Sequence, residues 1–401
     1  MRSLSESGWT FHWLEWFANL IAINSSYYFS LCVVYLQDSR HLGAPLTTDN
    51  MSNFNIAVLD GDGIGPEVIK QGIKVLNQVA LKFGHKFRFD FAPVGAIAID
   101  QTGDPLPEET LDLCKRSDAI FFGSIGHPRF DNDPTATVRP EQGLLRLRKE
   151  LGLYANLRPV AGYKELTHLS PLRPERMEGV DMLIVRELTG GIYFGDKGRR
   201  DGGDTAFDTC LYTRIEIERI VKMGFEAAGK RRGKLMLVDK ANVMESSRLW
   251  REVTREMASD YPDVELGFMF VDNAAMQLIL NPAQFDVIVT SNMFGDILSD
   301  ASSVLAGSLG LLPSSSVGSK VGMFEPIHGS WPEGADQDRA NPTAAILSAA
   351  MMLDHLGLVK EGDAIRKAVG TVLESGKGTE DLRPKEQVGT DAMGDLIVAA
   401  L

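Results

Sequence analysis

Cysteine is scarce in this sequence, and its scarcity excludes two common ways of stabilising a fold. The 401 residues include three cysteines, Cys32, Cys114 and Cys210, and no two of them form a C-x-x-C pair. Such wide spacing indicates neither a disulfide framework nor a zinc site. We therefore expect a protein of a reducing compartment, the cytoplasm.

The sequence also has no excess of basic over acidic residues. The formal net charge of −13 at pH 7 argues against nucleic acid or an anionic membrane as a partner. An anionic substrate would therefore need a local cluster of basic side chains. No repeat with a period of about 20 to 50 residues is found. The composition, 44% hydrophobic and 24% charged, is that of a globular protein long enough for two lobes.

The first fifty residues differ from the rest. They hold three of the five tryptophans, Trp9, Trp13 and Trp16, and an uncharged stretch over 17–36 that Asn and Ser interrupt. The interruptions disfavour a membrane anchor, which needs about 20 apolar residues, and the acidic residues disfavour a transit peptide. Because Met51 directly precedes a strand-like run, we expect residues 1–50 to be an extension, either upstream sequence or a targeting segment.

Short β-rich runs recur from residue 56 onward. They are "IAVLD" (56–60), "AIFFG" (119–123), "MLIVRE" (182–187), "LMLVDK" (235–240), "ELGFMFVD" (265–272) and "FDVIVT" (285–290). Helix-length segments lie between most of them, which predicts an α/β fold with largely buried strands. Thr213 and Glu216 form a capping box that predicts a helix start, and "NPTAAILSAAMMLDHLG" predicts a buried helix. The glycine-rich segment 190–209 is either a disordered loop or an exposed hairpin.

The stretch "GDGIGPEV" follows the first predicted strand and precedes a helix, with Pro66 suited to the first helical turn. Its glycines allow a tight turn and a close backbone approach. The spacing is G-x-G-x-G, however, and the dinucleotide fingerprint is G-x-G-x-x-G. By itself the motif is a weak signal, and a plain βα turn is the alternative.

Two acidic residues, Asp296 and Asp300, lie four apart in "VTSNMFGDILSDASSVLAGSLGLLP" (289–313). On a helix this spacing places both carboxylates on one face. In one interpretation Asp296 caps the helix and Asp300 is a solvated surface residue. In the other the pair holds a divalent cation, because hard cations bind carboxylate oxygens.

A basic cluster appears in "RPEQGLLRLRKELGLYANLRP" (139–159), where Arg148 and Arg158 flank a short segment, while Arg186 ends the run "MLIVRE". Arginine binds carboxylates through two parallel hydrogen bonds, so the three can bind a di- or tricarboxylate; surface salt bridges are the alternative. Lys240 and Tyr193 can transfer protons if burial or a nearby cation shifts their pKa, or they can be structural.

Taken together, these motifs resemble those of the β-decarboxylating dehydrogenases, the family of isocitrate and 3-isopropylmalate dehydrogenases. The resemblance, strongest to the isopropylmalate branch, runs from about residue 55 to the C-terminus. It rests on the order and spacing of "GDGIGPEV", "GLYANLRP", "VRELTGGIYFG", "VDKANV", "VDNAAM", "NMFGDILSD", "EPIHGS" and "ANPTAAILS". Residues 1–50 take no part and are a non-family N-terminal extension.

The resemblance implies a homodimer of a two-domain α/β fold, the isocitrate/isopropylmalate dehydrogenase-like fold, which is not of the Rossmann type. The first, cofactor-side domain joins residues 51–153 with 307–401. The second domain, residues 154–306, carries the dimer and metal contacts. The segment 190–209 resembles the arm that clasps the partner subunit. No nucleic acid or membrane partner is implied for residues 51–401.

The implied activity is the oxidation and decarboxylation of (2R,3S)-3-isopropylmalate to 4-methyl-2-oxopentanoate with NAD, in leucine biosynthesis. Lys240 of the neighbouring subunit would take the C2 hydroxyl proton, and Tyr193 would help to protonate the carbon that loses CO₂. Mg²⁺ or Mn²⁺ would stabilise the intervening enolate. Two alternatives stay open: a sibling dehydrogenase acting on D-malate, tartrate or homoisocitrate, and a non-catalytic regulatory subunit.

The resemblance also implies a set of site residues in an active site shared between subunits. The metal ligands are Asp272, contributed by the other subunit, Asp296 and Asp300. The substrate-binding residues are Arg148, Arg158, Arg186, Asp272 and Leu144. The cofactor-binding residues are Glu141, His328, Gly329, Ser330, Trp331, Pro332, Glu333 and Asn341.

Leu144 and Leu145 in "EQGLLRLR" suit an isopropyl group, where isocitrate enzymes place polar residues; helix core is the alternative for both. Burying such a group contributes about 1.5 to 3 kcal/mol, and leaving a carboxylate unpaired against leucine costs more. Charge rejection therefore does most of the discrimination between substrates.

The cofactor segment "EPIHGSWPEGADQDRANP" departs from the family's usual "HGSAPDIAG". Trp331 replaces a small residue, Glu333 replaces the ribose-binding Asp, and Gly334 stands where Ile is common. An acidic side chain accepts hydrogen bonds from ribose hydroxyls and repels a 2′-phosphate, which favours NAD over NADP. Arg339, if turned toward the ribose, would allow some NADP activity.

Overall fold

The computed structural model describes residues 52–133 and 135–401. The expectations for residues 1–50 concern a segment outside the described residues. Within the described ranges, none of the helices combines the length and the apolar character needed to cross a bilayer.

Ten strands form one mixed sheet, in the order β2-β1-β3-β12-β11-β4-β5-β10-β8-β9. The strands are β1 (Asn53–Gly61), β2 (Lys86–Phe91), β3 (Ala119–Ser124), β4 (Ala155–Ala161), β5 (Asp181–Glu187), β8 (Lys234–Asp239), β9 (Glu265–Phe270), β10 (Val287–Thr290), β11 (Pro313–Val317) and β12 (Gly322–Pro326). All six strands predicted from the β-rich runs are present, which confirms the α/β prediction.

Parallel pairing joins β2, β1, β3 and β12 on one side of the sheet and β5, β10, β8 and β9 on the other. Antiparallel pairing joins β12 to β11, β11 to β4 and β4 to β5. The two parallel groups therefore run in opposite directions. The strand β11 escapes prediction because "PSSSV" is rich in serine rather than in β-branched apolar residues. Two of its serine hydroxyls are bonded across the sheet: Asn156 Nδ2 donates to Ser314 Oγ at 2.8 Å, and Ser316 Oγ donates to Glu325 Oε1 at 3.3 Å.

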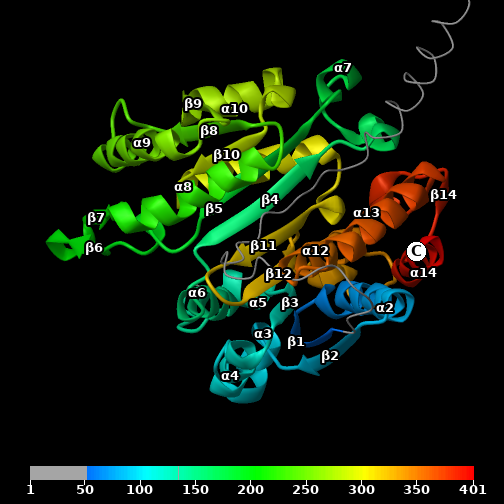
Figure 1. The fold of residues 1–401 in the computed structure, drawn as a ribbon. Helices are drawn as coiled ribbons and strands as arrows, with labels where there is room; N and C mark the ends of the chain where they lie inside the picture. Colours follow the sequence, from blue (N-terminus) through cyan, green and yellow to red (C-terminus); the bar gives the residue numbers. More distant parts are fainter. Residues whose placement is uncertain (1–51, 134) are drawn as a thin grey trace, which may run out of the picture. The chain divides into compact units, whose positions relative to one another are not determined.

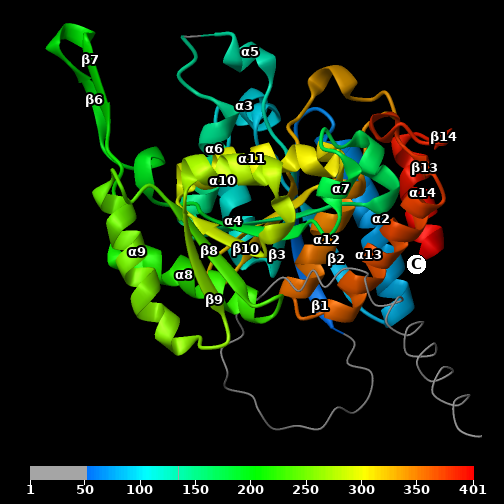
Figure 2. The same cartoon turned by 90° about the horizontal axis from the view of Figure 1, so that it is seen from above.

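Helices cover both faces of the sheet. They are α2 (Gly65–Phe83), α3 (Ala96–Thr102), α4 (Glu108–Arg116), α5 (Pro128–Asp131), α6 (Pro140–Glu150), α7 (Pro174–Met177), α8 (Arg214–Gly229), α9 (Glu245–Met257), α10 (Val271–Leu280), α11 (Asn292–Ser303), α12 (Thr343–His355), α13 (Val359–Glu374) and α14 (Thr390–Ala400). In Figure 1, α2, α12, α13 and α14 pack together beside β1, β3 and β12. Figure 2 shows β8 and β10 between α10 and α11 on one side and α8 and α9 on the other.

Local sequence signals set several of these helix boundaries. Thr213 is the N-cap of α8, and its backbone N–H donates to Glu216 Oε2 at 2.7 Å in the predicted capping box. Pro66 lies in the first turn of α2. The helix α12 is buried along nearly its whole length, as its apolar sequence predicts.

Two hydrophobic clusters form the interior. The first includes Leu59, Leu106, Phe122, Leu147 and Met323. The second includes Met182, Ile184, Phe285, Ile288 and Leu298. Their residues fall inside the two domains expected from the sequence, whose boundaries stay a prediction. Full burial of a side chain of this size contributes about 1.5 to 3 kcal/mol, so each cluster can stabilise its own part of the sheet.

The glycine-rich segment 190–209 forms a hairpin. Its strands β6 (Lys197–Arg200) and β7 (Thr205–Asp208) pair antiparallel and project away from the large sheet in both views (Figures 1 and 2). The hairpin interpretation is therefore confirmed, and the disordered-loop interpretation is wrong. A second small pair joins β13 (Lys377–Gly378) and β14 (Glu386–Gln387).

Candidate active site

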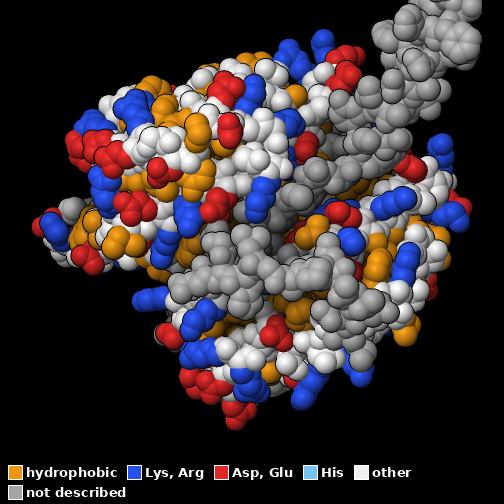
Figure 3. Space-filling view, in the orientation of Figure 1, with side chains coloured by type: hydrophobic (Ala, Val, Ile, Leu, Met, Phe, Trp, Pro, Cys, Tyr) orange, Lys and Arg blue, Asp and Glu red, His pale blue; other side chains and the backbone are white. Residues whose placement is uncertain are grey.

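Three arginines that are far apart in the sequence line one cavity of about 410 Å³. Arg148 comes from α6, Arg158 from β4 and Arg186 from β5. Their side chains are 13%, 13% and 5% exposed, so the surface salt bridge interpretation is wrong for all three. On the face shown in Figure 3, by contrast, basic and acidic side chains are interspersed over the described surface.

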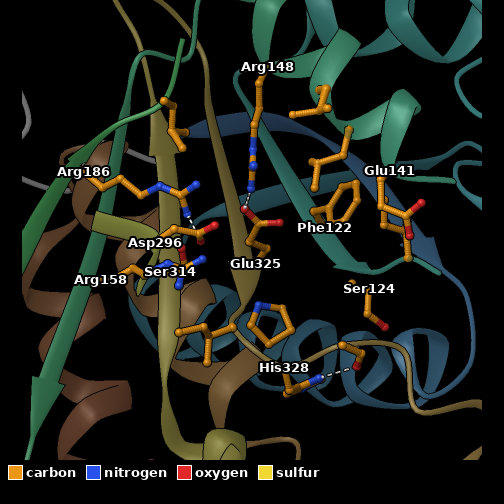
Figure 4. A pocket seen from close by; sticks show the side chains of 18 of the residues that line it. Phe122, Ser124, Glu141, Arg148, Arg158, Arg186, Asp296, Ser314, Glu325 and His328 are labelled. Atoms are coloured by element: carbon orange, nitrogen blue, oxygen red, sulfur yellow. Dashed lines mark hydrogen bonds and ion pairs between the residues drawn. The ribbon is translucent and has the colours of Figure 1, made fainter. Parts of the chain in front are cut away.

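Each of these arginines is paired with a carboxylate, and Figure 4 shows the pairs of Arg148 with Glu325 and of Arg186 with Asp296. Arg148 Nη2 donates to Glu325 Oε1 at 2.9 Å, and Arg158 Nη1 donates to Asp300 Oδ1 at 2.7 Å. Arg186 donates to Asp296. Burial lowers the pKa of Arg186 to about 10 and the Asp296 carboxylate opposes this shift, so Arg186 stays cationic at neutral pH. The positive charge of each arginine is thus paired with the negative charge of one carboxylate.

Asp296 and Asp300 both lie on α11, one helical turn apart. The N-cap of this helix is Ser291 and Asp296 lies inside it, so the interpretation of Asp296 as a cap is wrong. Asp300 is 68% exposed but ion-paired with Arg158. Two carboxylates on one helix face are hard oxygen donors, which suits Mg²⁺ or Mn²⁺.

A complete metal site is not formed within the described part of one chain. No three His, Cys, Asp or Glu side chains among residues 52–133 and 135–401 come together in a way that could hold a metal ion. The third predicted ligand, Asp272, is bonded elsewhere. Asp296 and Asp300 therefore fit a cation site as two of its ligands, and the remaining protein ligand must come from outside this group.

Tyr193 reaches the same cavity from the turn Gly191–Tyr193. Its hydroxyl donates a hydrogen bond of 2.7 Å to Asp296 Oδ2. Burial and the negative charge of Asp296 both raise the pKa of the Tyr193 phenol. Tyr193 therefore keeps its proton at neutral pH and can donate it.

Lys240 and Asp272 form a separate cluster. Lys240 directly follows β8, and Asp272 lies in the first turn of α10. Lys240 Nζ lies 2.9 Å from Asp272 Oδ1, and this hydrogen bond lowers the pKa of Asp272. Neither residue lines the 410 Å³ cavity. One chain thus brings together the arginines, Tyr193 and the α11 aspartates, but not Lys240 and Asp272.

The same cavity also has an apolar lining. Leu144, Leu145 and Leu188 line the cavity. Leu144 also packs partly against the first hydrophobic cluster, whereas Leu145 is 41% exposed. The helix-core interpretation is therefore wrong for Leu145, and the cavity combines buried positive charge with an aliphatic surface.

A second cavity, of about 580 Å³, adjoins the first, and both are lined by His328 and Gly329. Burial lowers the pKa of His328, so its imidazole is neutral. Its Nε2 atom is buried and has no hydrogen-bond partner within the described part of the chain. A buried polar atom without a partner is costly, and a bound ligand would supply one. The two joined cavities thus fit a long ligand such as a dinucleotide.

The other predicted cofactor residues are distributed around these cavities. Gly329, Trp331 and Asn341 line the larger one, and Glu141 lines the smaller one. Pro332 and Glu333 lie in the turn after Trp331 and line neither. Ser330 is engaged within the protein, because its hydroxyl donates to the Gly126 carbonyl at 2.7 Å.

The glycine-rich stretch "GDGIGPEV" packs against the segment 328–334, which contains several of the predicted cofactor residues. Gly63 has a φ of +58°, and a Cβ atom there would lie 2.0 Å from the Ser330 carbonyl oxygen. That oxygen accepts a hydrogen bond of 2.8 Å from the Ile64 backbone N–H. The motif is therefore a βα turn whose glycine permits close contact with the segment 328–334.

Three carboxylates that line these cavities, Glu325, Glu380 and Asp381, were not singled out from the sequence. Glu325 pairs with Arg148, and Glu380 accepts hydrogen bonds of 3.0 and 2.7 Å from Arg339 Nε and Nη2. Glu325 lies in the motif "EPIHGS", which marks it as a site residue, but its partner is 177 positions away. No local pattern marks Glu380.

The mixed sheet and the arginine-lined cavity define an α/β protein with a site suited to an anionic ligand, and comparison with known proteins gives the family. The model of the isocitrate/isopropylmalate dehydrogenase family matches residues 55–397. The chain belongs to this family, and it is an oxidoreductase. The matched range begins after the N-terminal extension and includes every predicted site residue.

Two relatives with high sequence identity are both named 3-isopropylmalate dehydrogenase. The 3-isopropylmalate dehydrogenase of Bacteroides fragilis strain YCH46 is 56% identical over 348 residues, which cover 86% of this chain and 98% of that protein. The 3-isopropylmalate dehydrogenase of Carboxydothermus hydrogenoformans is 57% identical over 351 residues, covering 86% and 94%. Among solved structures, isocitrate dehydrogenase from Methylococcus capsulatus superposes with a TM-score of 0.78 at 35% identity, covering 86% and 99%.

Proposed function

We propose that the protein oxidises and decarboxylates (2R,3S)-3-isopropylmalate with NAD, giving 4-methyl-2-oxopentanoate and CO₂ in cytoplasmic leucine biosynthesis. The observation that carries this proposal is the single cavity lined both by three buried arginines and by Leu144, Leu145 and Leu188. Guanidinium groups bind carboxylates through paired hydrogen bonds, and the leucines accommodate a branched alkyl group. The names of the relatives agree with this substrate.

The arginines position the substrate. Arg158 and Arg186 point toward the α11 aspartates, and Arg148 toward Glu325. Their positive charges line the same cavity as the leucines and would bind the two carboxylates of the malate unit. A third carboxylate, as in isocitrate, would meet the leucine wall, where leaving it unpaired is costly. The wall thus favours isopropylmalate over isocitrate.

We propose that the enzyme acts as a homodimer and that Lys240 and Asp272 serve the site of the neighbouring subunit. Lys240 and Asp272 lie outside the cavity of their own chain. Beside them, α10 exposes the apolar side chains of Met276 and Ile279, which are 54% and 60% exposed. Exposed apolar patches mark protein interfaces. The hairpin β6–β7 would clasp the partner, and the domains would comprise residues 51–153 with 307–401 and residues 154–306.

The protons are handled by side chains of the protein. Lys240 of the partner would accept the C2 hydroxyl proton, and Tyr193, kept protonated by its raised pKa, would donate to the carbon that loses CO₂. Asp296, Asp300 and the partner's Asp272 would hold Mg²⁺ or Mn²⁺, which when bound supplies Lewis-acid stabilisation of the negative charge left by decarboxylation. Asp296 also orients the Tyr193 hydroxyl through their hydrogen bond.

We place the dinucleotide across the two joined cavities. NAD, when bound, accepts the hydride. The neutral His328, with its unpartnered Nε2 atom, lies where the cavities meet. Glu141 would contact the part of NAD that lies nearest the substrate. Gly329, Trp331 and Asn341 would contact its adenosine half. In this arrangement Arg339 is held by Glu380, which favours NAD over NADP.

The test is a substrate panel with the purified protein. NADH formation is measured with Mg²⁺ and (2R,3S)-3-isopropylmalate, D-malate, tartrate, homoisocitrate or isocitrate, with NAD and NADP in parallel. We expect the highest kcat/KM for isopropylmalate with NAD. A marked preference for D-malate, tartrate or homoisocitrate would identify a sibling enzyme. No turnover with any substrate would identify a non-catalytic subunit.

A further inference from the structure

Trp331 combines two unusual features at the wall of the 580 Å³ cavity. It is one of the large apolar side chains left exposed, at 45%. Its φ of +36° lies in the left-handed region, which non-glycine residues rarely adopt. A strained backbone that holds an exposed aromatic ring at a cavity wall is a sign of function rather than of packing.

The ring of Trp331 is fitted to Gly334, three residues further on. A Cβ atom at Gly334 would lie 2.5 Å from the indole carbon Cδ2, so any side chain there would displace the indole. The turn is closed by a hydrogen bond of 3.0 Å from the Gly334 N–H to the Trp331 carbonyl. Trp331 and Gly334 therefore form a coupled pair. Together they replace the family's small residue and isoleucine with a flat indole surface.

The position of the indole is also defined by a charged neighbour. The Arg339 guanidinium carbon lies 5.8 Å from the centroid of the Trp331 ring, within cation–π distance. Arg339 is itself held by two hydrogen bonds to Glu380. The indole thus packs against the Gly334 backbone with the Arg339 guanidinium over its ring, and it lines the cavity that adjoins His328.

We propose that Trp331 is a base-stacking residue, which holds the purine ring of the dinucleotide by contact between its flat face and the base. This inference rests on the proposed use of NAD. An exposed indole offers a planar partner for any base, because stacking does not read the hydrogen-bonding edge. The stacking would therefore tolerate changes at the purine edge, such as adenine to hypoxanthine, and would contribute only to the adenosine half of the ligand.

The test compares binding to the full-length protein and to the Trp331→Ala, Trp331→Leu and Trp331→Phe variants. Dissociation constants are measured by calorimetry for NAD, AMP and nicotinamide mononucleotide. Trp331→Ala and Trp331→Leu should weaken binding of NAD and AMP by about 10-fold or more, the effect of losing one stacked base. Trp331→Phe should stay within about 3-fold, because it keeps an aromatic face. Binding of nicotinamide mononucleotide should not change.

Tryptophan fluorescence provides an independent measurement that does not depend on turnover. NAD and AMP should quench the emission of the wild-type protein, and this quenching should be absent in Trp331→Phe. The other four tryptophans, Trp9, Trp13, Trp16 and Trp250, remain in Trp331→Phe, so the emission of that variant with and without ligand gives their contribution. Thermal unfolding of each variant verifies that it is folded.

The outcomes separate this inference from the proposed function. If the wild-type protein binds NAD but Trp331→Leu binds it equally tightly, or if quenching persists in Trp331→Phe, Trp331 is not a stacking residue and the proposed function stands. If the folded wild-type protein does not bind NAD at all, the proposed function fails, and the stacking role fails with it.

Discussion

The hydroxyl of Tyr193 donates a hydrogen bond of 2.7 Å to Oδ2 of Asp296, and Arg186 binds the same carboxylate. A proposed proton donor, a proposed metal ligand and a proposed substrate-binding residue thus meet at one carboxyl group. The residues come from a turn, a helix and a strand that are distant in the sequence. Because Tyr193 and Arg186 both donate to the Asp296 carboxylate, removing any one of the three changes the hydrogen bonding and the local charge around the other two.

We expect Tyr193→Phe to lower kcat by about 100-fold with little change in KM. The variant removes only the hydroxyl, and a positioned general acid contributes about 10² to 10⁴ in rate. The raised pKa of Tyr193 keeps the wild-type donor protonated throughout the neutral range. Steady-state kinetics with isopropylmalate measure the effect. Tyr154→Phe, at a tyrosine that lines neither cavity, is the matched control and should retain full activity.

Complementation tests whether the active site is shared between subunits. Lys240→Met and Asp296→Asn should each be inactive alone. After the two variants are unfolded and refolded together, about a quarter of the wild-type activity should return, because half of the dimers are mixed and each has one intact site. If Lys240 and Asp296 served the same chain's site, mixing would restore nothing. Each variant refolded alone is the control.

Glu380→Gln should increase the use of NADP. Arg339 is paired with Glu380, and both side chains are about half exposed, so the pair is held weakly and its loss should not unfold the protein. Release of Arg339 provides a cation for a 2′-phosphate, and we expect kcat/KM for NADP to rise about 10-fold relative to that for NAD. The double variant Glu380→Gln/Arg339→Ala should lose this gain. A gain that survives removal of Arg339 would have another origin.

Leu145→Ala should weaken the recognition of the isopropyl group. Leu145 lines the cavity and is 41% exposed, so its truncation removes only part of an apolar contact. The expected cost is about 1 kcal/mol, or about a 5-fold rise in KM for isopropylmalate. KM for D-malate, which lacks the alkyl branch, should not change. Leu81→Ala, at a leucine that is 80% exposed and lines neither cavity, is the control. Equal effects on both substrates would contradict the proposed contact.

His355 should make stability depend on pH in the acid range. Its ring packs against Phe324, with centroids 5.5 Å apart, and burial lowers the pKa of His355 from 6.5 to about 4. The unfolded chain therefore binds more protons than the folded protein between pH 6.5 and 4. The stability due to neutral His355 is present above pH 6.5 and lost as the pH falls toward 4.

The loss should reach about 3 kcal/mol, since each pKa unit corresponds to about 1.4 kcal/mol. Urea unfolding of the wild-type protein and of His355→Phe, repeated from pH 7 to pH 4, measures it. Carboxylates contribute to acid unfolding equally in both proteins, so the difference between the two curves isolates His355. A constant difference across this range would show that the histidine does not titrate in this way.

Several features could be read from short stretches of the sequence, because their causes are local. The β-rich runs became strands of the large sheet, and the Thr213 box starts α8. The spacing of Asp296 and Asp300 correctly predicted that both lie on one helix. Strand β11 was not predicted, because its sequence is rich in serine and it is held by distant contacts, such as the hydrogen bonds from Asn156 Nδ2 to Ser314 Oγ and to the Ser315 carbonyl.

Sequence patterns determined six of the ten strands of the large sheet, several helix boundaries and, through motif order, the family of this protein. They also indicated which charged side chains and which proton-transferring side chains are candidates for the site. Only the tertiary structure decided which groups meet: Arg148 with Glu325, Arg339 with Glu380, and Lys240 with Asp272 away from the cavity. Local propensities act over a few residues along the chain, whereas ion pairs and cavities depend on distances in space, which the packing of the sheet and its helices sets.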